Sequence, residues 1–218
     1  MVVCAHSDDE ALGCSGSISK WSEIADEVAI IFLTNGVSSR LDARKEAHAI
    51  RYEEQIQSLA LIGVTQFRNF DFPDNGLDGI PLLELAQNIE KEISNFKPTV
   101  ILTHSLADLN VDHRKCCEAV LVATRPQAHS KIRLVASFEV LSSTEWFYTN
   151  GNSFQPNLYV DITETMELKL QACRCYASEM REPPNARSIQ NVRHLAALRG
   201  ATVGVSYAES FEVMRLIV

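Results

Sequence analysis

The stretch Met1-Val2-Val3-Cys4-Ala5-His6-Ser7-Asp8-Asp9-Glu10 joins a short apolar run to a histidine and three acidic residues. The apolar part is typical of a buried strand, and a helical pattern starts at about Glu10. In α/β proteins the active site lies at the carboxyl ends of the sheet strands. The stretch therefore predicts a strand, a polar loop that could hold a reaction centre, and a helix.

Strand and helix patterns alternate along the rest of the sequence. We expect strands at residues 1–5, 28–33, 66–70, 99–103 and 132–140, and an edge strand at 210–218. We expect helices at about 10–24, 42–61, 82–95, 111–124, 163–176 and 188–198, and Pro183-Pro184 interrupts any helix across 181–187. Strands separated by helices of this length form βαβ units. The sequence predicts one α/β domain, 1–218, with a mostly parallel sheet.

The composition of the chain argues against several classes of binding partner. A net charge of −8 over 218 residues argues against nucleic acid and anionic membranes as partners. No apolar run approaches the roughly 18 residues of a membrane span, and no secretory signal pattern is evident. The six cysteines fall in strand and helix patterns without zinc-ribbon spacing, so we expect buried free thiols. A cytoplasmic protein is the expectation.

A second polar cluster, 103–114, follows the strand expected at 99–103. It contains His104, Asp108, Asn110, Asp112 and His113. In a parallel sheet this loop emerges at the same edge as the first cluster, although about a hundred positions separate the two. Polar loops expected at 35–40 and 71–81 also follow strands and should rim that edge.

Together the two clusters offer a metal site. His6, Asp9 and His113 form a set of two histidines and one carboxylate with open positions, which suits Zn²⁺ and also Fe²⁺. Asp8 is adjacent but points elsewhere, so it could accept a proton from water whose pKa the metal lowers towards about 7.

A structural interpretation competes with this one. Asp-Asp before a helix commonly serves as N-cap and first-turn acid, and one nearby histidine would add little. Two such clusters, each at the end of an expected strand, favour a site.

These motifs resemble those of a known family. His6-Ser7-Asp8-Asp9-Glu10 resembles the Ala-His-Pro-Asp-Asp-Glu signature of the LmbE-like, or PIG-L, family of zinc-dependent de-N-acetylases. Asp112-His113 resembles the Asp-His that closes its second motif. The resemblance extends to residues 34–36, 51–54, 72–74, 97–98, 125–126 and 207–212.

The resemblance implies a Rossmann-like, three-layer α/β/α fold that removes acetyl from an N-acetylated amino sugar or glycoconjugate of the N-acetylglucosamine type. It makes His6, Asp9 and His113 the zinc ligands and Asp8 the general base. Arg51 and Asp74 resemble positions that touch substrate. A helix-surface ion pair and a turn-forming Asp are the competing interpretations for these two residues.

Two positions depart from the family pattern. Ser7 replaces a proline, which costs turn rigidity rather than chemistry. Asn110 stands where many members carry a histidine that acts as acid or stabilises the oxyanion. Asparagine donates a hydrogen bond but has no titratable proton.

Other groups would then have to supply the proton. Asp8 is our first choice, acting as base and then acid, and His104 is the second. Asp108 is a further candidate and is also expected as a substrate contact. His104 could instead hydrogen-bond backbone, and Asp108 could form an Asx turn. Asp112 could support a metal-bound imidazole or, because a neighbour rarely reaches an adjacent ring, orient Asn110.

Two other functions are weighed. A non-catalytic carbohydrate- or nucleotide-sugar-binding protein would explain Asn110, but binding alone does not need Asp8. A dinucleotide oxidoreductase is rejected, because Gly13-x-x-Gly16 lacks the three-glycine spacing.

Four arginines between residues 181 and 199 could steer a phosphorylated or nucleotide-linked sugar, although solvated helix charges are the favoured interpretation; they are Arg181, Arg187, Arg193 and Arg199. His48, His129 and His194 are expected at the surface. Oligomeric state is not readable, and a homo-oligomer is compatible with the pattern.

Overall fold

A computed structural model describes residues 1–24, 27–34, 36, 45–128, 130–148 and 153–218. The polar loop expected at 35–40, apart from Gly36, lies outside the described residues, as do His129 and the first three residues of the helix expected at 42–61.

Seven strands and seven α-helices are present in the described residues. The strands are β1 (Val2–Cys4), β2 (Ala29–Thr34), β3 (Gln66–Phe72), β4 (Val100–His104), β5 (Leu134–Phe138), β6 (Leu158–Asp161) and β7 (Ala208–Leu216). The helices are α1 (Asp9–Gly13), α2 (Ser15–Glu23), α3 (Lys45–Leu61), α4 (Leu82–Phe96), α5 (Val111–Ala123), α6 (Met166–Cys175) and α7 (Ile189–Val203). Leu77–Gly79 and Thr144–Trp146 form short 3₁₀ turns.

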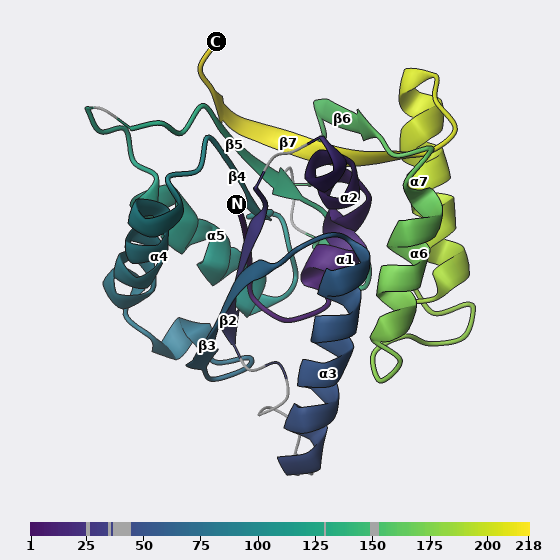
Figure 1. Cartoon of the computed structure of the whole chain (residues 1–218), viewed down its shortest axis with the longest axis horizontal. Helices are drawn as coiled ribbons and strands as arrows, with labels where there is room; N and C mark the ends of the chain where they lie inside the picture. The colour runs from purple at the N-terminus through teal and green to yellow at the C-terminus, as the bar shows by residue number, and fades with distance from the viewer. Residues whose placement is uncertain (25–26, 35, 37–44, 129, 149–152) are drawn as a thin grey trace.

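The strands form one sheet in the order β3-β2-β1-β4-β5-β7-β6. The first five strands are parallel, and β7 runs antiparallel to both β5 and β6. Helices α4 and α5 cover one face, and the other helices cover the opposite face (Figure 1). Strands β1 and β2 are buried along their whole length, which explains their continuous apolar sequence. The predicted α/β, mostly parallel, three-layer fold is confirmed.

Two strand predictions need correction. The last strand is not at the edge, because β7 lies between β5 and β6. The edge strand beside β7 is β6, which the sequence did not reveal, and β3 forms the opposite edge. The four residues of β6 are too few to display a clear alternation, and its pairing with β7 extends the sheet.

The helix expected at 10–24 is divided at Cys14. A side chain at Gly13 would bring a Cβ within 2.3 Å of the Phe138 ring on β5, so α1 approaches the sheet at a point that only glycine allows. Helix α2 then starts at Ser15. The short helix α1 thus directly follows the loop of residues 5–8.

The cysteine prediction is confirmed. All six thiols are free, five are buried and Cys175 is half-buried. No helix in the described part of the chain combines the length and the apolar character needed to cross a bilayer.

Candidate active site

The loop between β1 and α1 is held by hydrogen bonds that its own acidic residues accept. Asp8 has a φ of 114°, a left-handed conformation that costs a non-glycine residue free energy. Its N–H donates to Glu10 Oε2 at 3.0 Å, and the His6 N–H donates to Asp9 Oδ2 at 2.7 Å. The buried Glu10 also accepts the Tyr176 hydroxyl at 2.6 Å. These bonds stabilise the turn although Ser7 replaces proline.

Three predicted ligand atoms converge. His113 Nε2 lies 3.3 Å from His6 Nδ1 and 3.2 Å from Asp9 Oδ1, and His6 Nδ1 lies 3.4 Å from Asp9 Oδ2. Ligands at about 2.0–2.1 Å from a tetrahedral Zn²⁺ are about 3.3 Å apart, so the spacing fits. Asp9 Oδ1 is buried and has no hydrogen-bond partner among the described residues. The three residues therefore fit a divalent cation.

Each imidazole is supported on its other nitrogen by a carboxylate. Asp108 Oδ2 lies 3.1 Å from His113 Nδ1, and Asp112 Oδ2 lies 3.1 Å from His6 Nε2. Asp74 Oδ1 also approaches His6 Nε2, at 3.2 Å. Such carboxylates fix the tautomer and ring orientation of a metal-bound histidine.

The electrostatics of this cluster favour positive charge. Burial lowers the pKa of His113, but the carboxylates of Asp9 and Asp108 outweigh it and raise the value to about 9. Burial likewise opposes protonation of His6. The carboxylates that accept its N–H groups, chiefly that of Asp112, outweigh this effect and raise the pKa of His6 well above its usual value. The carboxylates thus bind cationic charge at this point, which a metal ion can replace.

Asp112 supports a candidate metal-binding imidazole, as one of its two interpretations expects, whereas Asp108 supports the other imidazole instead of facing the substrate. Asp112 does not reach His113 and instead supports His6, while its carboxylate accepts N–H donors from Asn75 at 2.6 Å and Leu77 at 3.0 Å. Its own N–H donates to Asn110 Oδ1 at 2.8 Å. Asp108 is fully buried, away from the cavity, and also accepts the hydroxyls of Ser143 and Thr144. Its position does not fit substrate contact or proton delivery.

His104 lies behind the ligand set. Its ring is fully buried and stacks on that of His113, with centroids 3.9 Å apart. Its Nε2 accepts the Ala5 N–H at 2.9 Å, and burial lowers its pKa to about 4. His104 is not among the residues that line the neighbouring cavity, so the proposed acid role does not fit its position. Because the ring is neutral, the 3.2 Å approach of Nε2 to Asp9 is no ion pair.

A cavity of about 300 Å³ opens beside the ligand set, and His6 is the candidate ligand that lines it. Its lining includes seven residues considered as candidates in the sequence, namely His6, Asp8, Arg51, Asp74, Asn110, Arg181 and Arg187. It also includes residues that the sequence did not indicate, among them Ser142, Trp146, Glu179 and Asn185.

Asp8 is buried between two arginines at the cavity wall. Arg187 Nη1 donates to its Oδ2 at 2.7 Å, and Arg51 Nη1 lies 3.8 Å from the same oxygen. Burial raises the pKa of Asp8 above its usual value, and the two guanidinium groups oppose that rise. Arg51 is itself buried, so it is not the helix-surface ion pair that was its alternative.

Asn110 forms the N-cap of α5 through its Oδ1. Its side-chain amide nitrogen has no hydrogen-bond partner among the described residues, and the residue lines the cavity. The amide can therefore donate a hydrogen bond to a ligand.

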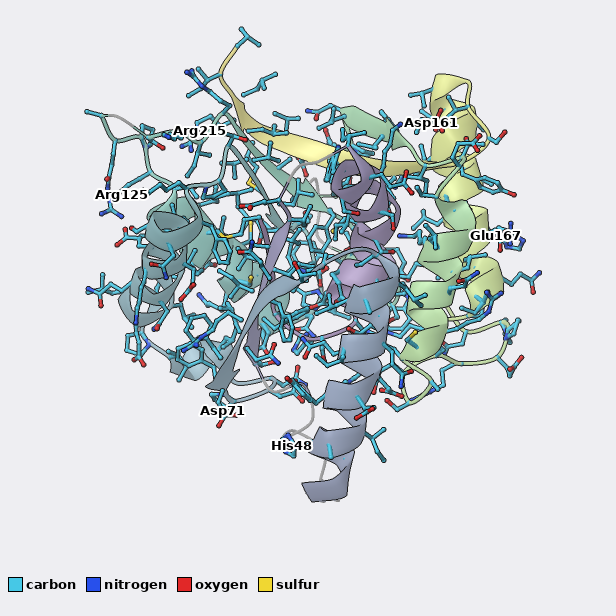
Figure 2. The ribbon with its side chains drawn as sticks, in the orientation of Figure 1. His48, Asp71, Arg125, Asp161, Glu167 and Arg215 are labelled. Atoms are coloured by element: carbon cyan, nitrogen blue, oxygen red, sulfur yellow. The ribbon has the colours of Figure 1, made fainter. Side chains whose placement is uncertain are left out.

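Other sequence features lie outside the site. His48 is exposed on α3, and Arg125 lies at the outer surface, where it pairs with Glu90 (Figure 2). His194 is exposed on α7. Arg193 pairs with Glu167 at the surface, as the solvated-charge interpretation expects, whereas Arg199 is half-buried and pairs with Glu139. Arg181 and Arg187 line the cavity, and Arg187 reaches Asp8.

Comparison with known proteins supplies the family. A model of the PIG-L family, described as GlcNAc-PI de-N-acetylase, matches residues 1–124, more than half of the chain. The chain belongs to the PIG-L family. The matched region contains the loop after β1, the β4–α5 loop and all three candidate ligands.

Two diacetylchitobiose deacetylases match most of this chain. The diacetylchitobiose deacetylase of Thermococcus kodakarensis is 28% identical over 94% of this chain and 78% of its own length. The N,N'-diacetylchitobiose deacetylase of Pyrococcus horikoshii, solved with an inhibitor, superposes with a TM-score of 0.78 at 24% identity, covering 98% of this chain and 83% of that chain. The chain is therefore an enzyme of the deacetylase class, hydrolases that cleave amide bonds.

The PIG-L fold also occurs in a different enzyme. The 4-carboxy-2-hydroxymuconate hydratase of Pseudomonas putida KT2440 has a TM-score of 0.74 at 21% identity and covers all of this chain and 96% of that chain. The fold alone does not decide the reaction, which has to be argued from the site.

Proposed function

We propose that the chain is a zinc-dependent hydrolase that removes the N-acetyl group from an amino-sugar derivative of the N-acetylglucosamine type. The observation that carries the proposal is the triangle of His6 Nδ1, Asp9 and His113 Nε2 at 3.2–3.4 Å, beside a polar cavity that His6 and Asp8 line. The family description and the deacetylase relatives support the reaction class. Fe²⁺ is the alternative metal for the same donor set.

The cavity suits a small polar substrate rather than a polymer. Its volume of about 300 Å³ and its lining of carboxylates, guanidinium groups and amides match a sugar with several hydroxyl groups. The buried free thiols and the net charge of −8 support a cytoplasmic enzyme without a nucleic-acid partner.

His6, Asp9 and His113 would hold the metal. A divalent cation there supplies Lewis-acid chemistry, since it polarises the amide carbonyl and lowers the pKa of water towards about 7. Asp8 removes the proton from the attacking water, because its carboxylate lines the cavity beside the ligands. The Asn110 amide donates a hydrogen bond to the carbonyl oxygen as negative charge develops there.

The departing amine needs a proton. Asn110 has none to give, and His104 and Asp108 are turned away from the cavity. Asp8 remains as the residue that both lines the cavity and carries the proton taken from water. We therefore assign it both proton transfers, first as base and then as acid.

Metal content and acetate release test the proposal together. Wild-type protein loaded with Zn²⁺ should release acetate from at least one member of a panel containing N-acetylglucosamine, diacetylchitobiose and phosphorylated or nucleotide-linked derivatives. His113→Ala should lose both metal and hydrolysis, whereas Asp8→Ala should keep metal and lose turnover. His194→Ala, at an exposed position, is the control and should change neither.

Two results would contradict the proposal. Full acetate release by Asp8→Ala would remove Asp8 from the mechanism. Sugar binding by a metal-loaded wild type that hydrolyses no substrate would favour the non-catalytic binding protein instead.

A further inference from the structure

Arg187 is tied to the cavity by both edges of its guanidinium group. Its Nη1 donates to Asp8 Oδ2 at 2.7 Å, and its Nε donates to Ser142 Oγ at 2.6 Å. The guanidinium is planar, so two hydrogen bonds from different nitrogens fix its orientation. Its side chain is only 21% exposed, which keeps water from competing for these bonds.

Glu179 connects Arg187 to the second arginine beside Asp8. Glu179 Oε1 lies 2.7 Å from Arg51 Nη2, and Oε2 lies 3.5 Å from Arg187 Nη1. Asp8, Arg51, Glu179 and Arg187 therefore form a closed ring of alternating charges in the cavity wall. Each charge in the ring has an opposite charge on both sides, which stabilises the arrangement where burial would otherwise disfavour it.

The ring leaves one oxygen of Asp8 available. Oδ2 faces both arginines, whereas Oδ1 receives no hydrogen bond from any residue that the structure describes. Rotation about the Cβ–Cγ bond of an aspartate is only weakly restricted, so the two oxygens of a carboxylate that nothing holds would exchange positions freely. The bond from Arg187 removes that freedom.

We propose that Arg187 is a positioning residue that anchors Asp8 through Oδ2 and thereby presents Oδ1 to the attacking water. This proposal rests on the proposed function. Arg187 and Glu179 lie outside residues 1–124, the part that matches the family model. The segment 179–187 therefore completes a site whose ligands come from the first half of the chain.

Steady-state kinetics of zinc-loaded variants test the proposal. Arg187→Ala should keep its metal, and its kcat should fall on the order of 10²-fold, as expected for a misplaced reacting group, with little change in KM. Arg187→Lys should fall by less, because a lysine supplies the charge but cannot bridge Asp8 and Ser142 as a rigid fork. Millimolar guanidinium ion should restore part of the kcat of Arg187→Ala and none of that of Asp8→Asn.

Arg193→Ala is the matched control. It removes one arginine from an exposed ion pair with Glu167 on the outer surface, so kcat, KM and the response to guanidinium should equal those of wild type (Figure 2). If Arg187→Ala does not fold, Arg187→Gln and Arg187→Lys carry the same comparison.

Several results would overturn the proposal. An unchanged kcat for Arg187→Ala in an otherwise active enzyme would contradict the role of Arg187 alone. A rise in KM without a fall in kcat would make Arg187 a substrate contact rather than a positioning residue. A wild type that releases no acetate from any substrate would instead contradict the proposed hydrolase, and the role of Arg187 with it.

Discussion

At the residue scale, the two histidines of the candidate site depend on carboxylates that are not themselves ligands. Asp108 holds His113 at 3.1 Å and Asp112 holds His6 at 3.1 Å, so both rings present a fixed nitrogen to the centre. Both carboxylates are fully buried and accept further hydrogen bonds, which restricts their own motion. The geometry of the three ligands is therefore set before any metal binds.

Asp108→Asn should weaken metal binding. The amide is nearly isosteric but loses the negative charge that holds the His113 N–H, and losses of 10–100-fold in metal affinity are typical of such changes. The affinity for Zn²⁺ can be measured by competition with a chelating dye. Asp78→Asn, at an exposed position in the β3–α4 connection, should bind Zn²⁺ as wild type does. Equal affinities for the two variants would mean that Asp108 does not support His113.

Asn110→Ser should separate the two functions of Asn110. Serine is as good an N-cap as asparagine, so the melting temperature should stay near that of wild type. The shorter side chain withdraws the amide donor from the cavity, and loss of one such donor costs about 10²–10³-fold in kcat. Calorimetry and steady-state kinetics on one preparation measure both. A wild-type kcat would show that the Asn110 amide does not stabilise the developing oxyanion.

At the element scale, a buried ion pair stabilises the break between α1 and α2. Lys169 Nζ on α6 donates to the carbonyl oxygens of Leu12 at 2.8 Å and Ala11 at 3.3 Å, near the end of α1. Glu209 on β7 accepts the N–H groups of Gly16 and Ser17 in the first turn of α2. The two side chains are 2.6 Å apart. Each charge thus faces the helix end whose dipole it complements.

Lys169→Met should destabilise the protein strongly. Removing one partner leaves the Glu209 charge buried, and broken buried pairs typically cost about 3–5 kcal/mol in the free energy of unfolding. Lys169→Met/Glu209→Gln should recover part of the loss, because no uncompensated charge remains. Lys20→Met, at an exposed position, should change the free energy of unfolding by less than about 0.5 kcal/mol. Urea unfolding measures all three, and equal losses in the two single variants would contradict the ion-pair explanation.

The same pair predicts a dependence of stability on alkaline pH. Burial lowers the pKa of Lys169, but Glu209 raises it by more, so the folded value exceeds the ordinary 10.5. A raised lysine pKa contributes stability that is complete below the unfolded value and is lost as pH rises through the folded value. The unfolding free energy of wild type should therefore fall above about pH 10.5 more steeply than that of Lys169→Met, when the two urea titrations are compared.

At the scale of the whole molecule, the candidate metal would join distant parts of the chain. His6 and Asp9 follow β1, whereas His113 lies in the first turn of α5, which follows β4, the strand beside β1. The segment 179–187 then covers the site from the second half of the chain. A ligand that binds only the folded protein stabilises it by mass action, and an assembled site of this kind does not exist in the unfolded chain.

Zinc should therefore raise the melting temperature. Free Zn²⁺ at about 100 times its dissociation constant corresponds to about 2.7 kcal/mol of added stability. Scanning calorimetry of dialysed protein with and without Zn²⁺ measures the shift. His113→Ala should show no shift and His194→Ala a full one, so equal shifts in these two variants would place the stabilising ion elsewhere.

Local sequence patterns determined the fold class and the two clusters that form the candidate site. Burial of whole strands produces continuous apolar runs, and strand ends in a parallel sheet share one edge, so His6, Asp9 and His113 could be brought together from residue order alone. The directions of the side chains and the order of the strands in the sheet could not be predicted from residue order. The position of β7 inside the sheet, the supports that Asp108 and Asp112 give to opposite rings, and the seclusion of His104 depend on packing between segments far apart in the chain.

Arg187 is the clearest example of a residue whose place in the site could not be recognised from the sequence alone. In the sequence it is one of four arginines between residues 181 and 199, with nothing nearby to distinguish it from a solvated charge. Only the folded chain brings it to Asp8, 179 positions away, and pairs both with Arg51 and Glu179. Residue types and their spacing specified which atoms could bind a metal ion. The tertiary structure decided which charges surround them, because electrostatic partners are set by distance in space rather than by order along the chain.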